Sequence, residues 1–120
     1  MENRSNWIEW DPTDNVGARN HVLSVTLMKV GRIALSFATH KKYWADKKYA
    51  LLFFNPVENQ IGIKPIGEPV QKSYEVASGP KNQHQIGATA FCKKFGINHE
   101  KARKFPVIWD QENEMVILQL

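Results

Sequence analysis

The sequence predicts an α+β domain, mostly β, in which two similar strand-helix-hairpin halves form one small barrel with two short helices. Three observations predict this fold: short segments in which apolar and polar residues alternate, two brief helix-forming segments, and a second appearance of the same pattern further along the chain. A chain of 120 residues has the usual length of one domain and can bury a core without disulfides.

Composition indicates a folded protein of a reducing compartment. The hydrophobic fraction of 42% and the charged fraction of 23% are ordinary for globular proteins. Cys92 is the single cysteine, so no internal disulfide can form. Residues 1–10 carry charges and no continuous apolar run, which argues against a signal peptide, and no stretch is long enough to span a membrane. We expect a cytoplasmic protein without membrane contact.

The first half follows a simple order. Leu23, Val25 and Leu27 alternate with polar residues, as in a half-buried strand. Ile33 and Leu35 form a second strand that ends at Ser36, a suitable N-cap for a helix reaching about Trp44. Residues 49–54 and 60–66 then form a hairpin, because 55–59 supply turn residues.

The second half repeats this order. Ile86 corresponds to Ile33 and Thr89 to the Ser36 N-cap, each 53 positions later, with a helix over Thr89–Phe95 that ends at Gly96. The hairpin recurs at a spacing of 54, where Glu112-Asn113 correspond to Glu58-Asn59, and 105–110 form one strand. The predicted organisation is an N-terminal arm over 1–20 and a single barrel domain over 21–120, made of half one (21–66), a linker (67–72) and half two (73–120).

The first half resembles an AbrB/MazE-type (SpoVT-AbrB) module. The resemblance lies in Gly31-Arg32-Ile33-Ala34-Leu35-Ser36, the basic helix after it, and the hairpin Ala50-Leu51-Leu52-Phe53-Phe54 with Ile61-Gly62-Ile63-Lys64-Pro65-Ile66. The second half resembles it through Phe91-Cys92-Lys93-Lys94-Phe95-Gly96-Ile97 and the closing hairpin. The resemblance implies an AbrB-like or double-psi-like swapped-hairpin barrel that presents basic residues to DNA, with two halves in one chain in place of a dimer.

Basic residues concentrate beside the two predicted helices. Residues 29–48 and 93–104 hold 11 of the 16 lysines and arginines and only 2 of the 12 carboxylates. Such clusters suit phosphate contacts, whose strength depends on salt, and lysine favours phosphates over base edges. The same charges are also what the solvated face of a short helix carries. The predicted nucleic-acid contacts are Arg32, His40, Lys41, Lys42, Lys47, Lys48, Lys93, Lys94, Arg103 and Lys104.

Two functions follow as hypotheses. The first is a DNA-binding regulator or mobile-element accessory protein that contacts mainly phosphates. The second is a protein-interaction module without nucleic-acid binding, antitoxin-like or a phage-encoded inhibitor, which captures a protein partner through Trp7 and Trp10 of the arm. Both a monomer and a homodimer fit the sequence.

Catalytic and metal-binding signatures are missing from the sequence. The four histidines do not lie at metal-ligand spacing, and Cys92 inside a helix reads as a buried apolar residue. No nucleophile elbow, phosphate-binding glycine loop or pair of catalytic carboxylates occurs, so we expect no enzyme and no cofactor. A small ligand in a barrel cleft stays open as a third hypothesis. Trp44 and Trp109 are expected to be partly exposed.

Overall fold

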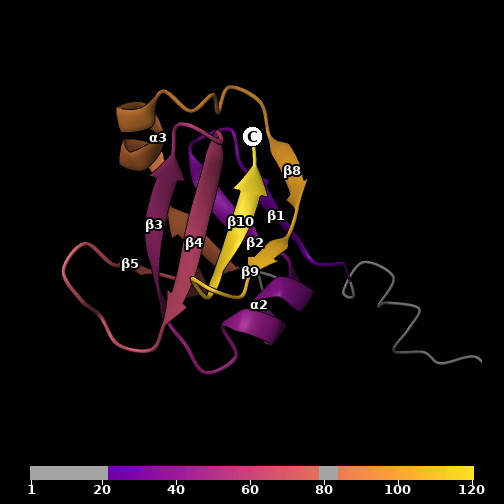
Figure 1. The fold of residues 1–120 in the computed structure, drawn as a ribbon, viewed down its shortest axis with the longest axis vertical. Coiled ribbons are helices and arrows are strands. Elements are labelled where there is room, and N and C mark those ends of the chain that lie inside the picture. Colours follow the sequence, from indigo (N-terminus) through magenta and orange to yellow (C-terminus); the bar gives the residue numbers. More distant parts are fainter. Residues whose placement is uncertain (1–21, 79–83) are drawn as a thin grey trace, which may run out of the picture.

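The computed structural model describes residues 22–78 and 84–120. This part of the chain is mostly β, with two antiparallel five-stranded sheets and two short helices (Figure 1). In chain order the elements are β1 (Ser24–Leu27), β2 (Arg32–Leu35), α2 (Phe37–Tyr43), β3 (Tyr49–Asn55), β4 (Gln60–Ile66), β5 (Tyr74–Glu75), β6 (Ala77–Ser78), β7 (His84–Gly87), α3 (Thr89–Phe95), β8 (Arg103–Pro106), β9 (Ile108–Asp110) and β10 (Met115–Gln119).

Sheet A has the strand order β6-β7-β2-β1-β8, and sheet B has the order β5-β3-β4-β10-β9. Each sheet therefore combines strands from both ends of the described chain. In sheet A, the predicted alternation sends Val25 and Leu27 of β1 to the inner face, where both are fully buried. In sheet B, Ile61 and Ile63 of β4 do the same.

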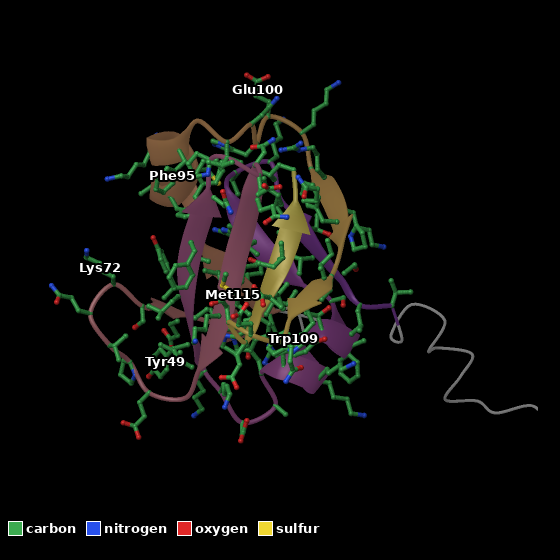
Figure 2. All side chains as sticks on the ribbon, in the orientation of Figure 1. Tyr49, Lys72, Phe95, Glu100, Trp109 and Met115 are labelled. Atoms are coloured by element: carbon green, nitrogen blue, oxygen red, sulfur yellow. The ribbon has the colours of Figure 1, made fainter. Side chains whose placement is uncertain are left out.

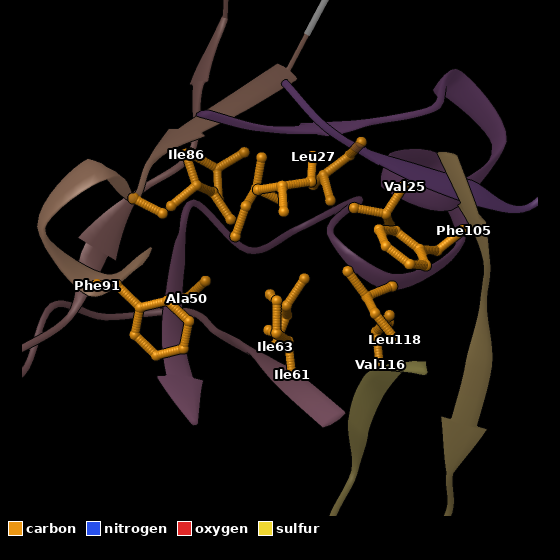
Figure 3. Close-up of a cluster of buried hydrophobic side chains, with 14 of the residues drawn as sticks. Val25, Leu27, Ala50, Ile61, Ile63, Ile86, Phe91, Phe105, Val116 and Leu118 are labelled. Carbon is orange, nitrogen blue, oxygen red and sulfur yellow. The ribbon is translucent and has the colours of Figure 1, made fainter. Parts of the chain in front are cut away.

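The core lies between the two sheets and is made of aliphatic side chains from both (Figure 3). Burying one such side chain stabilises the fold by roughly 1.5–3 kcal/mol. The fully buried large residues of the strands are Val25, Leu27, Ile33, Ile86, Ile61, Ile63, Val116 and Leu118. Because β-branched residues dominate this set, strand preference and burial favour the same conformation.

Helix α2 begins as the sequence predicts. Ser36 is its N-cap, and the Ser36 Oγ accepts a hydrogen bond from the Thr39 amide at 3.2 Å. The same hydroxyl donates to the Val22 carbonyl at 2.8 Å, which ties the start of α2 to the residues just before β1. Thr39 is fully buried and its hydroxyl donates to the Ser24 carbonyl.

Helix α3 has the predicted bounds but a different N-cap residue. Ala88, not Thr89, is the N-cap, and no side chain caps the helix. Thr89 is the first helical residue, and its hydroxyl instead donates to the Val30 carbonyl at 2.7 Å, across to the β1–β2 turn. The predicted end is confirmed, because Gly96 occupies the left-handed region with φ of 64°.

Two strand pairs join equivalent places in the predicted halves. In the β2–β7 pair Ile33 lies opposite Ile86, and in the β4–β10 pair Gly62 lies opposite Ile117. The separations are 53 and 55 positions. In each case a residue faces its own counterpart, which is the pairing that an approximate twofold axis between the strands produces.

The hairpin turns show that the predicted spacing of 54 is wrong by one residue. The side chains of Asn55 and Asp110, 55 positions apart, each accept hydrogen bonds from two turn amides. Asn59 and Glu114, again 55 apart, are the residues with positive φ in the two turns. Compared with the spacing of 53 at β2 and β7, two additional residues therefore lie between β7 and the second turn.

Strand pairing in the described residues gives two separate sheets, and the predicted closed barrel is not confirmed. The sequence predicts one strand over 105–110, whereas the structure has β8 in sheet A and β9 in sheet B, with Val107 alone between them. Val76 separates β5 in sheet B from β6 in sheet A in the same way. The chain thus crosses between sheets at single residues.

Trp44 departs from its predicted exposure. Its side chain is only 1% exposed, and its Nε1–H donates to the Tyr49 carbonyl at 3.2 Å. The indole is buried because the end of α2 closes one end of the core, and the hydrogen bond satisfies its polar atom. In the described ranges, no helix is long and apolar enough to cross a membrane.

Candidate nucleic-acid interface

A polar row runs across the outer face of sheet A. The strand registers place Gln85 of β7 opposite Ala34 of β2, Ala34 opposite Thr26 of β1, and Thr26 opposite Lys104 of β8. We call Gln85, Ala34, Thr26 and Lys104 the polar row. Its centre is made of small side chains, so an extended ligand can approach the sheet closely.

Arg32 lies beside the polar row on the same face. It is exposed, and its Nη1 donates to the Gln85 Oε1 at 3.5 Å. Lys104, at the other end of the row, is exposed as well. Arg32 on β2 and Lys104 on β8 therefore lie on the same face as Ala34 and Thr26. Because β1 separates their strands, and neighbouring strands are about 4.8 Å apart, the two cations are roughly 10 Å from each other across the sheet.

The strands of the two sheets differ in charge. The described strands of sheet A carry Arg32, Arg103 and Lys104 and no carboxylate. Those of sheet B carry one cation, Lys64, and two carboxylates, which are Glu75 and Asp110. Hydrogen bonds from the Asn113 side chain and from turn amides lower the pKa of Asp110. The strands of sheet A therefore carry net positive charge, and those of sheet B carry net negative charge.

Arg103, predicted as a nucleic-acid contact, is engaged inside the protein. Its Nη2 donates to the Asn98 carbonyl at 3.1 Å, and its guanidinium carbon lies 5.2 Å from the centre of the Phe105 ring. The side chain is half-buried, and its Nε is buried without a hydrogen-bond partner. Arg103 thus holds the loop before β8 and is less available to a ligand than Lys104.

The structure does not bring the two helix clusters together. Tyr43 of α2 stacks on Trp109, at the β9–β10 turn, with ring centres 4.4 Å apart. Phe95 of α3 contacts Phe54, at the β3–β4 turn, with ring centres 4.9 Å apart. These turns lie at opposite ends of sheet B, so α2 and α3 do too (Figure 1). One groove lined by both helices is therefore not formed.

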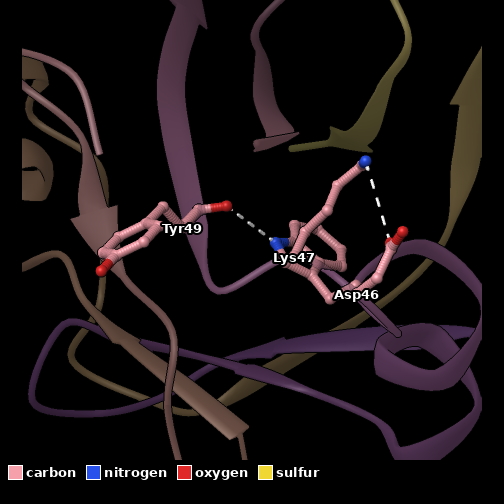
Figure 4. Close-up of polar contacts among 4 residues, drawn as sticks. Asp46, Lys47 and Tyr49 are labelled. Carbon is pink, nitrogen blue, oxygen red and sulfur yellow. Dashed lines mark hydrogen bonds and ion pairs between the residues drawn. The ribbon is translucent and has the colours of Figure 1, made fainter. Parts of the chain in front are cut away.

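The predicted lysines of the helices are mostly exposed. Lys41, Lys42 and Lys48 around α2, and Lys93 and Lys94 on α3, are exposed. Three of their ammonium groups lie over aromatic rings: Lys41 over Phe37, Lys42 over Tyr43 and Lys94 over Phe95, at 5.6 to 5.9 Å from the ring centres. Lys47 is half-buried and pairs with Asp46 at 3.9 Å (Figure 4). These cations form two separate groups.

His40 has a specific contact that the sequence does not reveal. Its ring stacks on that of His84 in β7, with ring centres 3.4 Å apart and planes at 4°. Burial, and then the charge of His84, lower the pKa of His40, and burial also lowers the pKa of His84. Both imidazoles are consequently neutral at neutral pH, so His40 serves packing between α2 and sheet A and adds no charge there.

A pocket of about 400 Å³ lies between α2 and the β5–β6 segment. Its lining mixes Lys47 and Lys48 with Asp46 and Glu75, so the lining selects neither anions nor cations. Within 22–78 and 84–120, no group of three His, Cys, Asp or Glu side chains is arranged to hold a metal ion. Cys92 is buried, and burial raises the pKa of its thiol, which disfavours a nucleophilic role.

Sequence reasoning missed Thr26, Ala34 and Gln85. A signal for Thr26 and Ala34 was present, since alternation within 24–27 and 32–35 turns them away from the core. Only the strand order reveals that they share a row with Lys104. The predicted partner contacts Trp7 and Trp10 lie outside the described residues. Searches of protein-family models, of curated proteins and of solved structures find nothing that matches this chain.

Proposed function

We propose that the protein binds nucleic acid, with DNA as the expected partner, through the outer face of sheet A. Arg32 and Lys104 are the proposed phosphate contacts. The observation that carries the proposal is the charge of this sheet, whose described strands hold three cations, two of them on the outer face, and no carboxylate. Phosphates are attracted to such a surface, and binding releases the counterions that neutralise them.

The shape of the face supports phosphate contact. Ala34 and Thr26 keep the middle of the polar row low. Arg32, two residues from Ala34 on β2, and Lys104, at the end of the row, extend from the same face. A separation of roughly 10 Å between these cations spans about three phosphates of one DNA strand, at ~3.4 Å of helix axis each. The two cations therefore reach different phosphates of one duplex.

The chemistry of the contacts favours affinity over sequence reading. Lys104 is a point charge, and Arg32 shares one guanidinium nitrogen with Gln85, which leaves less of its planar fork for guanine. Phosphate contacts carry no direct sequence information. The exposed lysines of α2 and α3 lie near the two ends of sheet B, and their charges add to the positive electrostatic potential around the protein.

We infer that the chain is an internally duplicated AbrB-like barrel, supported by residues that face their own counterparts in β2–β7 and β4–β10. Val76 and Val107 are the proposed corners, because the chain passes from one sheet to the other at each of them. In this arrangement the twofold axis crosses sheet A beside Arg32.

The test is an anisotropy titration of a labelled DNA duplex at about 50 and 200 mM salt. We expect affinity to fall steeply with salt. The variants Arg32→Gln and Lys104→Gln should each weaken binding and reduce the log–log salt slope by about 0.9, the value for one lost phosphate contact. Both residues are exposed, so folding should be unaffected.

Lys94→Gln is the matched control, since it removes an equally exposed charge from α3, away from the polar row. A slope that drops equally for Lys94→Gln would place the contacts on the helices instead. No binding by the intact chain at the lower salt concentration would reject the function itself.

A further inference from the structure

An apolar row crosses the outer face of sheet B. The registers place Phe53 of β3 opposite Gly62 of β4, Gly62 opposite Ile117 of β10, and Ile117 opposite Ile108 of β9. We call Phe53, Gly62, Ile117 and Ile108 the apolar row. Its two ends are exposed, Phe53 at 44% and Ile108 at 46%. Exposing large apolar side chains to water in this way costs free energy that a row of polar side chains would not.

Leu51 and Met115 widen this apolar surface. Leu51 lies two residues before Phe53 on the same face of β3, and Met115 lies two residues before Ile117 on β10. Met115 leans over the glycine of the row, because a Cβ built on Gly62 would lie 2.8 Å from the Met115 sulfur. Figure 2 shows Met115 over the middle of the sheet.

No described helix covers this face. The ring contacts of both helices are with residues of the opposite face, since Trp109 and Phe54 pack against the core. In Figure 1 the strands β3, β4 and β10 lie in front, with α2 and α3 at the two ends of the sheet. Within the described residues no helix lies over Phe53 and Ile108, the exposed ends of the apolar row, whereas Ile117 between them is only 8% exposed.

The first described residues of the chain lie next to one end of the apolar row. The Val107 amide donates to the Leu23 carbonyl at 3.2 Å, and the next residue, Ile108, is the end of the apolar row. The chain before Val22 comprises residues 1–21 and contains Trp7, Ile8 and Trp10. From Trp10 to Val22 an extended chain reaches about 40 Å, whereas the four strands of the row span only ~19 Å.

The size of the surface favours the arm over a second copy of the chain. Four strands of ~19 Å in width and a height of ~13 Å give roughly 250 Å². A stable dimer buries about 800 Å² on each partner, while one tryptophan buries about 150–250 Å². Lys64, the single cation in the strands of sheet B, is opposite in charge to Glu9 and Asp11, which flank Trp10.

We propose that residues 6–11 of the same chain dock on the apolar row, with the indoles of Trp7 and Trp10 against Phe53, Met115 and Ile108. The proposal concerns sheet B and does not depend on nucleic-acid binding by sheet A. It assigns the two tryptophans to an internal contact instead of to a separate protein partner.

The first test uses the full chain with labelled isoleucine and methionine methyl groups. Indole rings shift the NMR signals of methyl groups that they contact. In the double variant Trp7→Ala/Trp10→Ala, the methyl signals of Ile108 and Met115 should move, while those of the buried Ile33 and Ile86 stay in place. Unchanged Ile108 and Met115 signals would overturn the proposal.

The second test measures chymotrypsin cleavage after Trp10. We expect docking to slow cleavage, and Phe53→Ser to remove that protection. Phe37→Ser is the matched control, because Phe37 is 43% exposed and lies on α2. Equal acceleration by both variants would contradict docking on the row. Nuclear Overhauser contacts between labelled and unlabelled chains in a mixture, and none within one chain, would identify a second copy as the occupant and overturn the proposal.

Discussion

On its outer face sheet A presents the polar row Gln85–Ala34–Thr26–Lys104, whereas sheet B presents the apolar row Phe53–Gly62–Ile117–Ile108. On their inner faces the two sheets are alike, since both bury valine, leucine and isoleucine. The core therefore requires the same chemistry of each sheet, and the difference between them lies entirely on the sides turned away from it.

This difference shows where function is to be sought. Solvent-facing strand positions contribute little to core packing, so their composition reflects what each face contacts. A cationic face with small residues at its centre suits a phosphate chain. An apolar face with exposed Phe53 and Ile108 suits a second apolar surface. The proposals for the two sheets rest on this contrast.

The largest expected effect tests whether the inner faces are equivalent. Ile33→Ala in sheet A and Ile63→Ala in sheet B each remove a fully buried side chain and leave a cavity. Each should lower the free energy of unfolding by about 2–5 kcal/mol. Urea denaturation measures both, and Val57→Ala, at a residue 88% exposed, is the control. A small effect in one sheet alone would show that the core does not depend on both sheets equally.

A smaller effect separates the glycines of the two sheets. Gly31, in the β1–β2 turn, has φ of 85°, and a Cβ there would lie 2.8 Å from the Thr89 backbone. Gly31→Ala should cost at least about 1–2 kcal/mol, from the left-handed conformation alone. Gly62→Ala should cost less, because the contacted atom is the mobile end of Met115. If thermal unfolding shows that Gly62→Ala loses as much stability as Gly31→Ala, the Met115 side chain cannot move aside and is held in place over the apolar row.

The smallest effect concerns the two ring stacks that hold α2. One joins His40 to His84 of sheet A, and the other joins Tyr43 to Trp109 of sheet B. The pKa values of both histidines are lowered in the folded protein, so the unfolded chain binds protons first as pH falls. The free energy of unfolding is therefore highest above a pH of about 6.5, the ordinary histidine pKa, and it decreases as the pH falls below that value.

Thermal unfolding as a function of pH measures this loss. His40→Phe should reduce the dependence on pH, because it removes one of the two titrating rings. An unchanged pH dependence in that variant would place the titrating groups elsewhere. As the histidines gain protons, α2 should loosen from sheet A and keep its contact with sheet B, where Tyr43 stacks on Trp109.

Local structure was predictable where neighbouring residues decide it. The helix after Ser36, the αL glycine at Gly96 and the hairpin over 49–66 follow from capping, positive φ and alternation. The N-cap of α3 was not predictable, because the Thr89 hydroxyl donates to the carbonyl of Val30, 59 positions away, and Ala88 is the N-cap instead. Of the candidate site, Arg32 and Lys104 were among the predicted contacts, while the polar row beside Arg32 was not predicted.

The sequence by itself determined most of the strands, both helices and the positions of the two hairpins, since these depend on backbone preference and on alternation over a few residues. Tertiary structure alone decided that 105–110 divides between two sheets, that Trp44 is buried, and that the lysines of α2 and α3 lie apart. The physical reason for this division is that the pairing of strands depends on contacts between residues far apart in the chain, such as Thr26 with Lys104. No local pattern specifies them.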